Sequence, residues 1–236
     1  MKEKPDSSKG PRPLGIADFM NFVNDTEPEW TLLAVKAPIE QAAGAFADLR
    51  KTDRWLHDVP RRDSKEDDDL DTSLAMALQL RDSPWTVIIR DLFDYTEPGH
   101  KGIAQDARTL SAKFKTRAIA FSGEDTAGVL AYDLFDGGQL LERAEWEEGG
   151  EFFVFRSTLR KQPTIKEVGQ EFADEVFREQ GIYVPACYAK SEEEDAWICV
   201  EKVSADSIER ADLIGLEQPE EDEDEDEEDD EDEDEE

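Results

Sequence analysis

Residues 128–146, GVLAYDLFDGGQLLERAEW, decide the fold class of this 236-residue chain. Two apolar segments, GVLAYDLF and QLLERAEW, flank the short separator DGG. Glycine adopts positive φ at low cost, and glycine-containing pairs between two such segments are a strong signal of a β-hairpin. We therefore predict two antiparallel strands that are joined by a tight turn at residues 136–138.

Further strand-like segments on both sides extend this hairpin into a sheet. RAIAFS (117–122) precedes it and EFFVFRST (151–158) follows it. Earlier in the chain, SLAMALQL and WTVIIRDL, separated by RDSP, predict a second hairpin over residues 73–92, and EWTLLAVKA (29–37) predicts a first strand. Short strands with turn signals between them favour an antiparallel sheet.

Three segments carry apolar residues at helical spacing, namely residues 38–51, 101–115 and 163–181. Thr164 is the expected N-cap of the third helix, because Glu167 follows it at the spacing of a capping box. SADSIERADLI (204–214) predicts a short terminal helix. Together the elements predict an α+β fold: a single domain with a mostly antiparallel (mixed) sheet and about three amphipathic helices packed on it.

Two segments resemble each other within the chain. PIEQAAGAFAD (38–48) aligns with TIKEVGQEFAD (164–174), with isoleucine and Phe-Ala-Asp at matching positions. A predicted strand precedes each segment and an apparent hairpin follows each, so residues 29–92 and 151–203 are candidate copies of a β-α-β-β unit. The alternative is two amphipathic helices that agree by chance. Different strand arrangements around the two helices would argue against a duplication.

The composition changes at both ends of the predicted domain. Residues 1–14 are rich in Pro, Gly, Ser and Lys and are expected to be disordered, and residues 15–28 are expected to form a short helix or linker. The folded α+β domain is predicted over residues 29–216. Residues 217–236 are predicted to be a disordered tail, since every residue from Glu220 to Glu236 is Asp or Glu and none can bury apolar area.

The hydrophobic pattern gives no membrane or secretion signal. No stretch approaches the roughly 18 apolar residues of a membrane span. The beginning of the chain, MKEKPDSSKGPRPLG, has positive charge but no apolar run after it, unlike a secretory signal. The expected compartment is therefore the cytoplasm, without membrane binding.

The chain is acidic in its body as well as in its tail. It has 61 acidic and 27 basic residues, for a net charge of −34. Without the seventeen tail carboxylates, 44 acids remain against the same 27 bases, which is a net charge of −17. Such a surface repels nucleic acid and attracts basic proteins, polyamines and divalent cations, although a local basic patch can override the average. We predict a basic protein partner, no direct nucleic-acid binding and no cofactor.

The residues that most often carry catalysis are sparse. His57 and His100 are the only histidines, neither lies near a recognisable nucleophile motif, and both are interpreted as ordinary surface or loop residues. Cys187 and Cys199 lie twelve residues apart and could face each other across a predicted hairpin. Two buried thiols are the favoured interpretation, while a disulfide and a metal site stay open.

One acidic loop resembles the beginning of a calcium-binding loop. The pattern requires Gly at the sixth position and Glu at the twelfth, but Thr72 and Leu78 occupy these positions. An EF-hand is therefore excluded, and a solvated loop that binds divalent cations at most weakly is expected. The candidate residues are Asp67, Asp68, Asp69 and Asp71.

A second acidic pair lies in SGEDTAG (122–128) between two predicted strands. Glu124 and Asp125 belong to a turn, or alternatively serve as paired carboxylates for ligand binding or proton transfer. Trp85 and Trp197 could line a pocket with them, although core or rim packing is the more frequent role of tryptophan.

These patterns support three hypotheses for function. The first is a non-enzymatic acidic binding protein that recognises a basic protein through electrostatic complementarity. Its candidates are an immunity-type protein that neutralises a cationic toxin, or a mimic of nucleic-acid charge. The alternative is a small-molecule sensor or enzyme with a carboxylate and tryptophan pocket around Glu124 and Asp125. The third is a structural domain with a solubilising tail.

Overall fold

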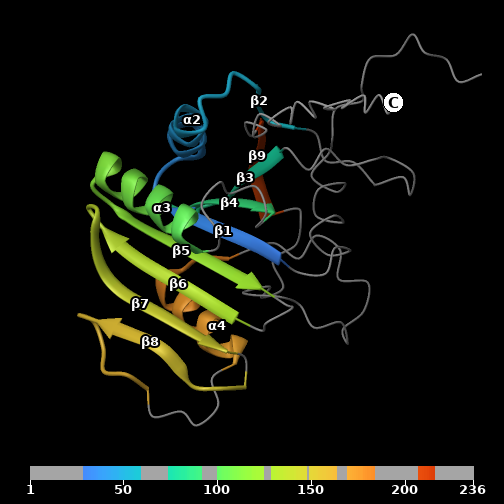
Figure 1. Ribbon diagram of the computed structural model, residues 1–236. Coiled ribbons are helices and arrows are strands. Elements are labelled where there is room, and N and C mark those ends of the chain that lie inside the picture. The colour runs from blue at the N-terminus through green and yellow to red at the C-terminus, as the bar shows by residue number, and fades with distance from the viewer. Residues whose placement is uncertain are drawn as a thin grey trace, which may run out of the picture.

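A computed structural model gives the fold for most of the predicted domain. The residues that it describes are 29–59, 74–91, 100–124, 129–147, 149–163, 169–183 and 207–215. Within these residues, nine strands form a single antiparallel sheet, and three helices pack against it (Figure 1). The strand order is β2-β9-β3-β4-β1-β5-β6-β7-β8. The predicted α+β class is confirmed.

The elements follow one another along the chain in this order: β1 (Glu29–Val35), α2 (Ile39–Leu49), β2 (Trp55–Leu56), β3 (Leu74–Leu80), β4 (Thr86–Asp91), α3 (His100–Phe114), β5 (Arg117–Glu124), β6 (Val129–Asp136), β7 (Gln139–Glu147), β8 (Phe152–Ser157), α4 (Gln170–Gln180) and β9 (Ile208–Gly215). The predicted hairpins over residues 73–92 and 128–146 are both present, as β3–β4 and β6–β7.

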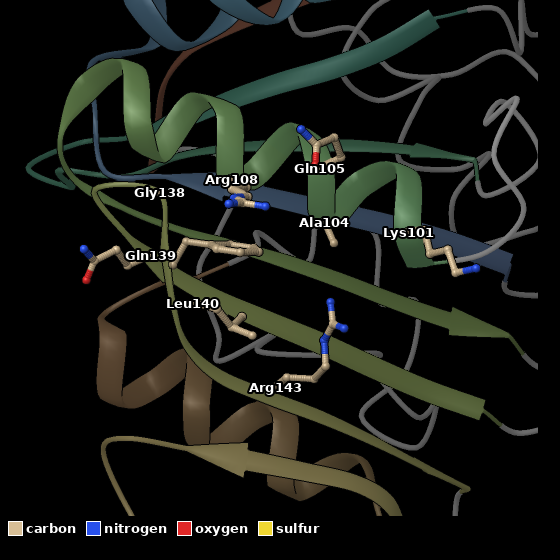
Figure 2. A pocket seen from close by; sticks show the side chains of 9 residues that line it. Lys101, Ala104, Gln105, Arg108, Gly138, Gln139, Leu140 and Arg143 are labelled. Carbon is tan, nitrogen blue, oxygen red and sulfur yellow. The ribbon is translucent and has the colours of Figure 1, made fainter.

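The turn between β6 and β7 requires its glycines for two different reasons. Gly137 and Gly138 both have positive φ, 57° and 83°. Gly138 also lies beside α3 (Figure 2). A Cβ atom on this residue would stand 2.8 Å from the Cβ of Ala112. The Gly138 N–H donates to Ser111 Oγ at 3.0 Å, so the turn is tied to the helix.

Replacing Gly138 by alanine is expected to lower the free energy of unfolding by about 2–4 kcal/mol, because left-handed strain and overpacking add. The matched control is Gly137→Ala, which has similar φ but nothing within 4 Å of the new Cβ. That change should cost about 1 kcal/mol. Urea unfolding of both variants measures the difference. Equal losses would show that the contact with α3 is unimportant.

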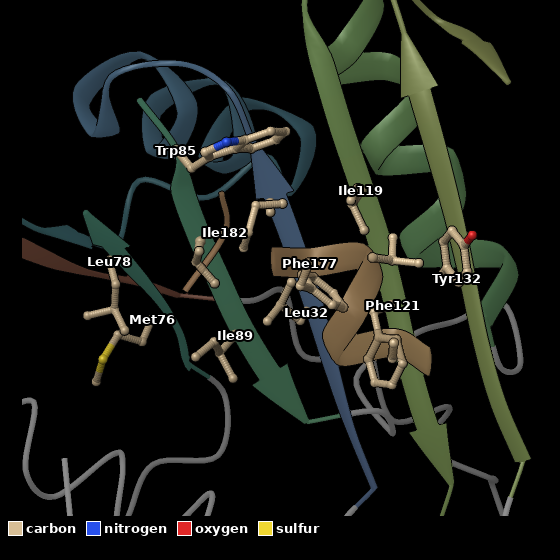
Figure 3. Packing of buried hydrophobic residues seen from close by; sticks show 14 of the residues in the cluster. Leu32, Met76, Leu78, Trp85, Ile89, Ile119, Phe121, Tyr132, Phe177 and Ile182 are labelled. Atoms are coloured by element: carbon tan, nitrogen blue, oxygen red, sulfur yellow. The ribbon is translucent and has the colours of Figure 1, made fainter. Parts of the chain in front are cut away.

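The central strands are buried on both faces, because helices cover both. α2 and α3 pack on one face, and α4 packs on the other. Side chains alternate along β5: Ile119 and Phe121 point to the α4 face, where Phe177 meets them (Figure 3), whereas Ala118 and Ala120 point to α3. Small side chains beneath α3 allow close approach of helix and sheet, and the bulky ones form the larger core against α4.

The two helices on the same face divide the sheet between them. α2 lies over β3, β4 and β9, and α3 lies over β1, β5 and β6. An ion pair between Arg50, just after α2, and Asp106 of α3 joins the helices. Among the residues described, this division leaves most of β7 without a covering helix on that face.

The predicted short helix at residues 204–214 is wrong. Residues 208–215 form β9, which pairs with β2 on one side and with β3 on the other. Ile208, Ala211, Leu213 and Ile214 are all buried, because the strand is covered on both faces. Its apolar residues do not alternate regularly with polar ones, so periodicity alone does not distinguish this strand from a helix.

The third helix begins later than predicted. α4 starts at Gln170 with Gly169 as its N-cap, so the predicted cap at Thr164 is wrong. Its end is as predicted, since Gly181 adopts a left-handed conformation with φ of 72°.

The proposed duplication stays a prediction, because the second hairpin, within residues 184–206, lies outside the described residues. The parts that are described differ between the two units. β1 lies in the interior of the sheet between β4 and β5, whereas β8 pairs with β7 alone among the strands described. α2 and α4 also cover opposite faces. These differences argue against a duplication.

Several sequence-based predictions concern residues outside the described part of the chain. They are the arm at 1–14, the linker at 15–28, the tail at 217–236, and the pair Cys187 and Cys199. Among the described helices, none has the length and apolar character needed to cross a membrane.

Candidate functional site

A pocket of about 550 Å³ lies between α3 and the β6–β7 hairpin (Figure 2). Its helical wall consists of Lys101, Ala104, Gln105 and Arg108. These residues are spaced three, four and seven apart, so they share one face of α3. The neighbouring face, with Ile103, Ala107 and Leu110, is buried against the sheet.

The sheet forms the opposite wall of the pocket. Phe135 comes from β6, and Leu140 and Arg143 come from β7. The pocket opens here because the helical layer ends: α3 lies mainly over β1, β5 and β6 and contacts β7 only weakly. Leu140 is accordingly 39% exposed.

The pocket is basic although the chain is acidic. Lys101, Arg108 and Arg143 all line it. Residues 100–117 contain five Lys or Arg residues, and their one acid, Asp106, pairs with Arg50 outside this segment. This basic segment was not identified from the sequence. The signal that could have identified it is its excess of basic residues in a chain with a net charge of −34.

A buried carboxylate holds Arg143 in place. Asp133 of β6 is fully buried directly opposite Arg143 of β7, and it accepts hydrogen bonds from Arg143 Nε at 2.5 Å and from Nη2. Burial alone would raise the pKa of Asp133. The hydrogen bonds from Arg143 and the proximity of His100 outweigh burial, so this pKa lies below its usual value. Asp133 in turn raises the pKa of Arg143.

His100 and Ser122 complete the polar cluster beneath the helix. His100 is the first residue of α3, and its Nδ1 lies 2.9 Å from Ser122 Oγ on β5. Its Nε2 lies 3.6 Å from Asp133 Oδ2. Serine, histidine and aspartate therefore lie in a row, but Ser122 is only 6% exposed and does not line the pocket. The cluster positions Asp133 and presents no nucleophile to a ligand in the pocket.

Two other carboxylates are fully buried in the described part of the chain, and both bind an arginine. Glu142 accepts from the Tyr132 and Ser157 hydroxyls and from Arg160 Nε at 3.1 Å. The pKa of Tyr132 is raised, first by burial and then by its hydrogen bond to Glu142. Asp212 accepts both hydrogen bonds of Arg210 at 2.8 Å. Within the described residues, each fully buried acid is thus compensated by an arginine.

Exposed acids lie close in the sequence to the aromatic residues that join α4 to the β7–β8 hairpin. Phe172 of α4 packs against Phe152, with ring centroids 5.1 Å apart. It also packs against Trp146 at 5.5 Å, and these contacts bring the acids that flank the aromatic residues to one end of the domain. We call this surface the acidic end; it consists of Glu147, Glu151, Asp174 and Glu175, of which all but the half-buried Asp174 are exposed.

Trp85 and Glu124, two residues of the predicted carboxylate and tryptophan pocket, do not lie together in the structure. Trp85 is buried and donates its indole N–H to the Gln180 carbonyl at 2.9 Å, so it belongs to the core. It lies beside the end of β1 that pairs with Thr86, whereas Glu124 pairs with Glu29 at the other end of β1.

The other predicted site residues lie outside the described part of the chain. They are Asp125, Trp197, Asp67, Asp68, Asp69, Asp71 and the acidic run from Glu220 to Glu236. In the described ranges, no three His, Cys, Asp or Glu side chains are grouped so as to hold a metal ion.

Comparison of the chain with protein-family models, curated proteins and solved structures finds no match.

Proposed function

We propose that this chain is a non-enzymatic acidic binding protein that recognises a basic protein partner through electrostatic complementarity. The observation that carries the proposal is the distribution of charge. Residues 1–219 keep a net charge of −17 without the acidic run, and the buried carboxylates Asp133, Glu142 and Asp212 are each compensated by an arginine. In the described part of the chain, the acids that can attract a partner are therefore the exposed ones.

The acidic end is the surface of the folded domain that best suits such a partner. Glu147 and Glu151 extend from the β7–β8 hairpin, and Glu175 extends from α4. The aromatic contacts of Phe172 fix these two elements relative to each other, so the backbone that carries the carboxylates is in place before a partner arrives. Preorganised charges lower the entropic cost of association.

The acidic run has a different role in this proposal. Seventeen consecutive carboxylates attract any basic surface over a Debye length of about 8–10 Å at physiological salt. Such long-range attraction raises the rate of association more than it slows dissociation. Specificity is then provided by the folded domain. A cationic toxin domain and a DNA-binding protein both have the surface charge that this arrangement requires.

Reversing three charges of the acidic end tests the proposal. Glu147→Lys, Glu151→Lys and Glu175→Lys together are expected to weaken binding of a basic partner about tenfold, mainly through the association rate. The partner is first captured at low salt from a native lysate on the immobilised full-length chain, and is then purified. Surface plasmon resonance measures its association and dissociation at low and high salt.

The matched control reverses three exposed acids at the opposite end of the sheet, by Glu40→Lys, Asp53→Lys and Glu209→Lys. This triple variant has the same net charge and should bind nearly as well as the unmodified chain at high salt. Deleting residues 217–236 should reduce the association rate more than it raises the dissociation rate. A partner affinity that is unchanged between low and high salt would refute the electrostatic mechanism, and equal losses in both triple variants would exclude the acidic end.

A further inference from the structure

We propose that the pocket between α3 and the β6–β7 hairpin binds a small organic phosphate, a phosphomonoester with an apolar ring or chain. This inference is independent of the proposed basic partner, because the ligand has the opposite charge and lies on a different surface. It rests on three cationic side chains around one cavity, on the fixed position of one of them, and on an apolar wall beside them.

The charge of the pocket favours an anion. Lys101, Arg108 and Arg143 contribute three positive charges, and the buried Asp133 beneath them contributes one negative charge. Glu145, which also acts electrostatically on Arg143, contributes a second negative charge, so the sum is one positive charge. A phosphomonoester carries about −1.5 to −2 at neutral pH and has three strong acceptor oxygens.

Arg143 is held in a position from which it can bind an anion. Asp133 accepts hydrogen bonds from Nε and Nη2 of this guanidinium, which leaves Nη1 outside that pair. The side chain remains 34% exposed, whereas Asp133 is fully buried. Because its position is already fixed, the side chain loses little conformational entropy on binding a phosphate oxygen. Arginine also matches phosphate geometrically through its fork of N–H donors.

Lys101 and Arg108 supply the other two charges from the helix. They are seven residues apart, which places them two turns apart on the same face of α3. Both side chains are exposed, and neither has an ion-pair partner within the part of the chain that the structure describes. Asp106 lies between them in the sequence, but it pairs with Arg50 of the neighbouring α2 segment.

The other residues that line the pocket indicate the character of the ligand beyond its phosphate group. Phe135, Leu140 and Ala104 form an apolar wall, and Gln105 and Gln139 add neutral hydrogen-bonding groups. The volume of about 550 Å³ lies within the range of about 300–1,000 Å³ typical of small-molecule pockets. Inorganic phosphate alone would leave the apolar wall unused, so an organic ester fits the pocket better.

Isothermal titration calorimetry of the full-length chain with 1-naphthyl phosphate tests the inference, and the neutral 1-naphthol is the matched ligand. We expect the phosphate to bind at least tenfold more tightly than the alcohol. The double variant Lys101→Ala, Arg108→Ala should weaken binding of the phosphate at least tenfold. Alanine is a good helix former, so these changes on an exposed face should preserve the fold, which thermal unfolding checks.

The matched control is Lys36→Ala with Lys113→Ala, which removes two exposed lysines outside the pocket and changes the net charge equally. Its affinity for 1-naphthyl phosphate should change less than twofold. Equal weakening in both double variants would overturn the inference, as would absence of binding to the unmodified chain or unchanged affinity of the pocket variant. The pocket variant should still bind the basic partner, so failure of one proposal leaves the other standing.

Discussion

Replacing Phe172 by alanine is expected to lower the free energy of unfolding by about 3–5 kcal/mol, the usual cost of removing a buried aromatic ring. Phe172 is 3% exposed, and its ring contacts Trp146, Phe152, Phe155 and Tyr132 at centroid distances between 5.1 and 6.4 Å. It is thus the main link between α4 and the end of the sheet. α4 has only eleven residues and no side-chain N-cap, so it depends on this packing.

Urea unfolding at neutral pH measures the loss, and the fluorescence of buried Trp146 reports whether the local packing changes in the native state. The control is Phe153→Ala, because Phe153 is 61% exposed on the neighbouring β8. This second change should alter the free energy of unfolding by less than about 0.5 kcal/mol. Similar losses in both variants would contradict the packing of α4 described above.

The hairpins could be predicted because their signals are local. The Asp-Gly-Gly turn at 136–138 and the short separator within residues 73–92 each lie between two apolar segments of strand length. Turn geometry then determines the antiparallel pairing without reference to the rest of the chain. The three amphipathic helices were predicted for the same reason, since each has one apolar face at regular spacing.

The position of β9 could not be predicted. Its partners β2 and β3 lie more than a hundred residues earlier in the chain. Burial on both faces also removes the alternation that would have distinguished it from a helix. β2 has only two residues, Trp55 and Leu56, and is a strand only because β9 lies beside it.

The register between β6 and β7 at the pocket could not be predicted from the sequence either. A regular hairpin with the turn at Gly137 and Gly138 would pair Asp133 with Glu142, two like charges. The register shift after Leu134 instead pairs Asp133 with Arg143. Because a shift of one residue exchanges the faces of a strand, this bulge places Asp133 and Glu142 on opposite sides of the sheet, each with its own arginine.

The contacts of His100 could not be predicted from the sequence either. His100 was interpreted as an ordinary surface or loop residue, since no nucleophile motif is near it in the sequence. Ser122 and Asp133 reach it from two strands that lie side by side only in the folded sheet. The basic character of residues 100–117, in contrast, was visible in the composition, and the helix predicted at 101–115 already placed Lys101 and Arg108 on one face.

Replacing Asp212 by asparagine is expected to lower the free energy of unfolding by about 3 kcal/mol at neutral pH. Asp212 is fully buried and accepts both hydrogen bonds of Arg210, the Trp55 indole N–H at 2.9 Å and the Asp58 backbone N–H at 2.9 Å. These contacts join β2 and the segment after it to β9. Breaking a buried ion pair by changing one partner usually costs about 3–5 kcal/mol, and the partial exposure of Arg210 favours the lower end of that range.

The control for this site is Asp58→Asn. The Asp58 side chain is exposed, and its φ of 50° is one that asparagine adopts readily. Only its backbone N–H contacts Asp212, and this contact is kept. The change should therefore alter the free energy of unfolding by less than about 0.5 kcal/mol. An equal loss in both variants would mean that the charge of the region matters rather than the pair between Asp212 and Arg210.

The pH dependence of the Asp212 variant provides an independent test of the buried pair. Burial alone would raise the pKa of Asp212, but the hydrogen bonds from Arg210, Asp58 and Trp55 outweigh it and hold this pKa below its usual value of 3.8. A carboxyl group with a lowered pKa in the folded state stabilises the protein above its unfolded pKa, and this contribution is lost as the pH falls through the folded pKa. The difference in free energy of unfolding between the unmodified chain and Asp212→Asn should therefore be constant from pH 7 to about pH 5 and should shrink below about pH 4. Urea unfolding of both chains at pH 7, 5, 4 and 3 measures it, and a difference that persists undiminished in acid would show that the charge of Asp212 does not stabilise the fold.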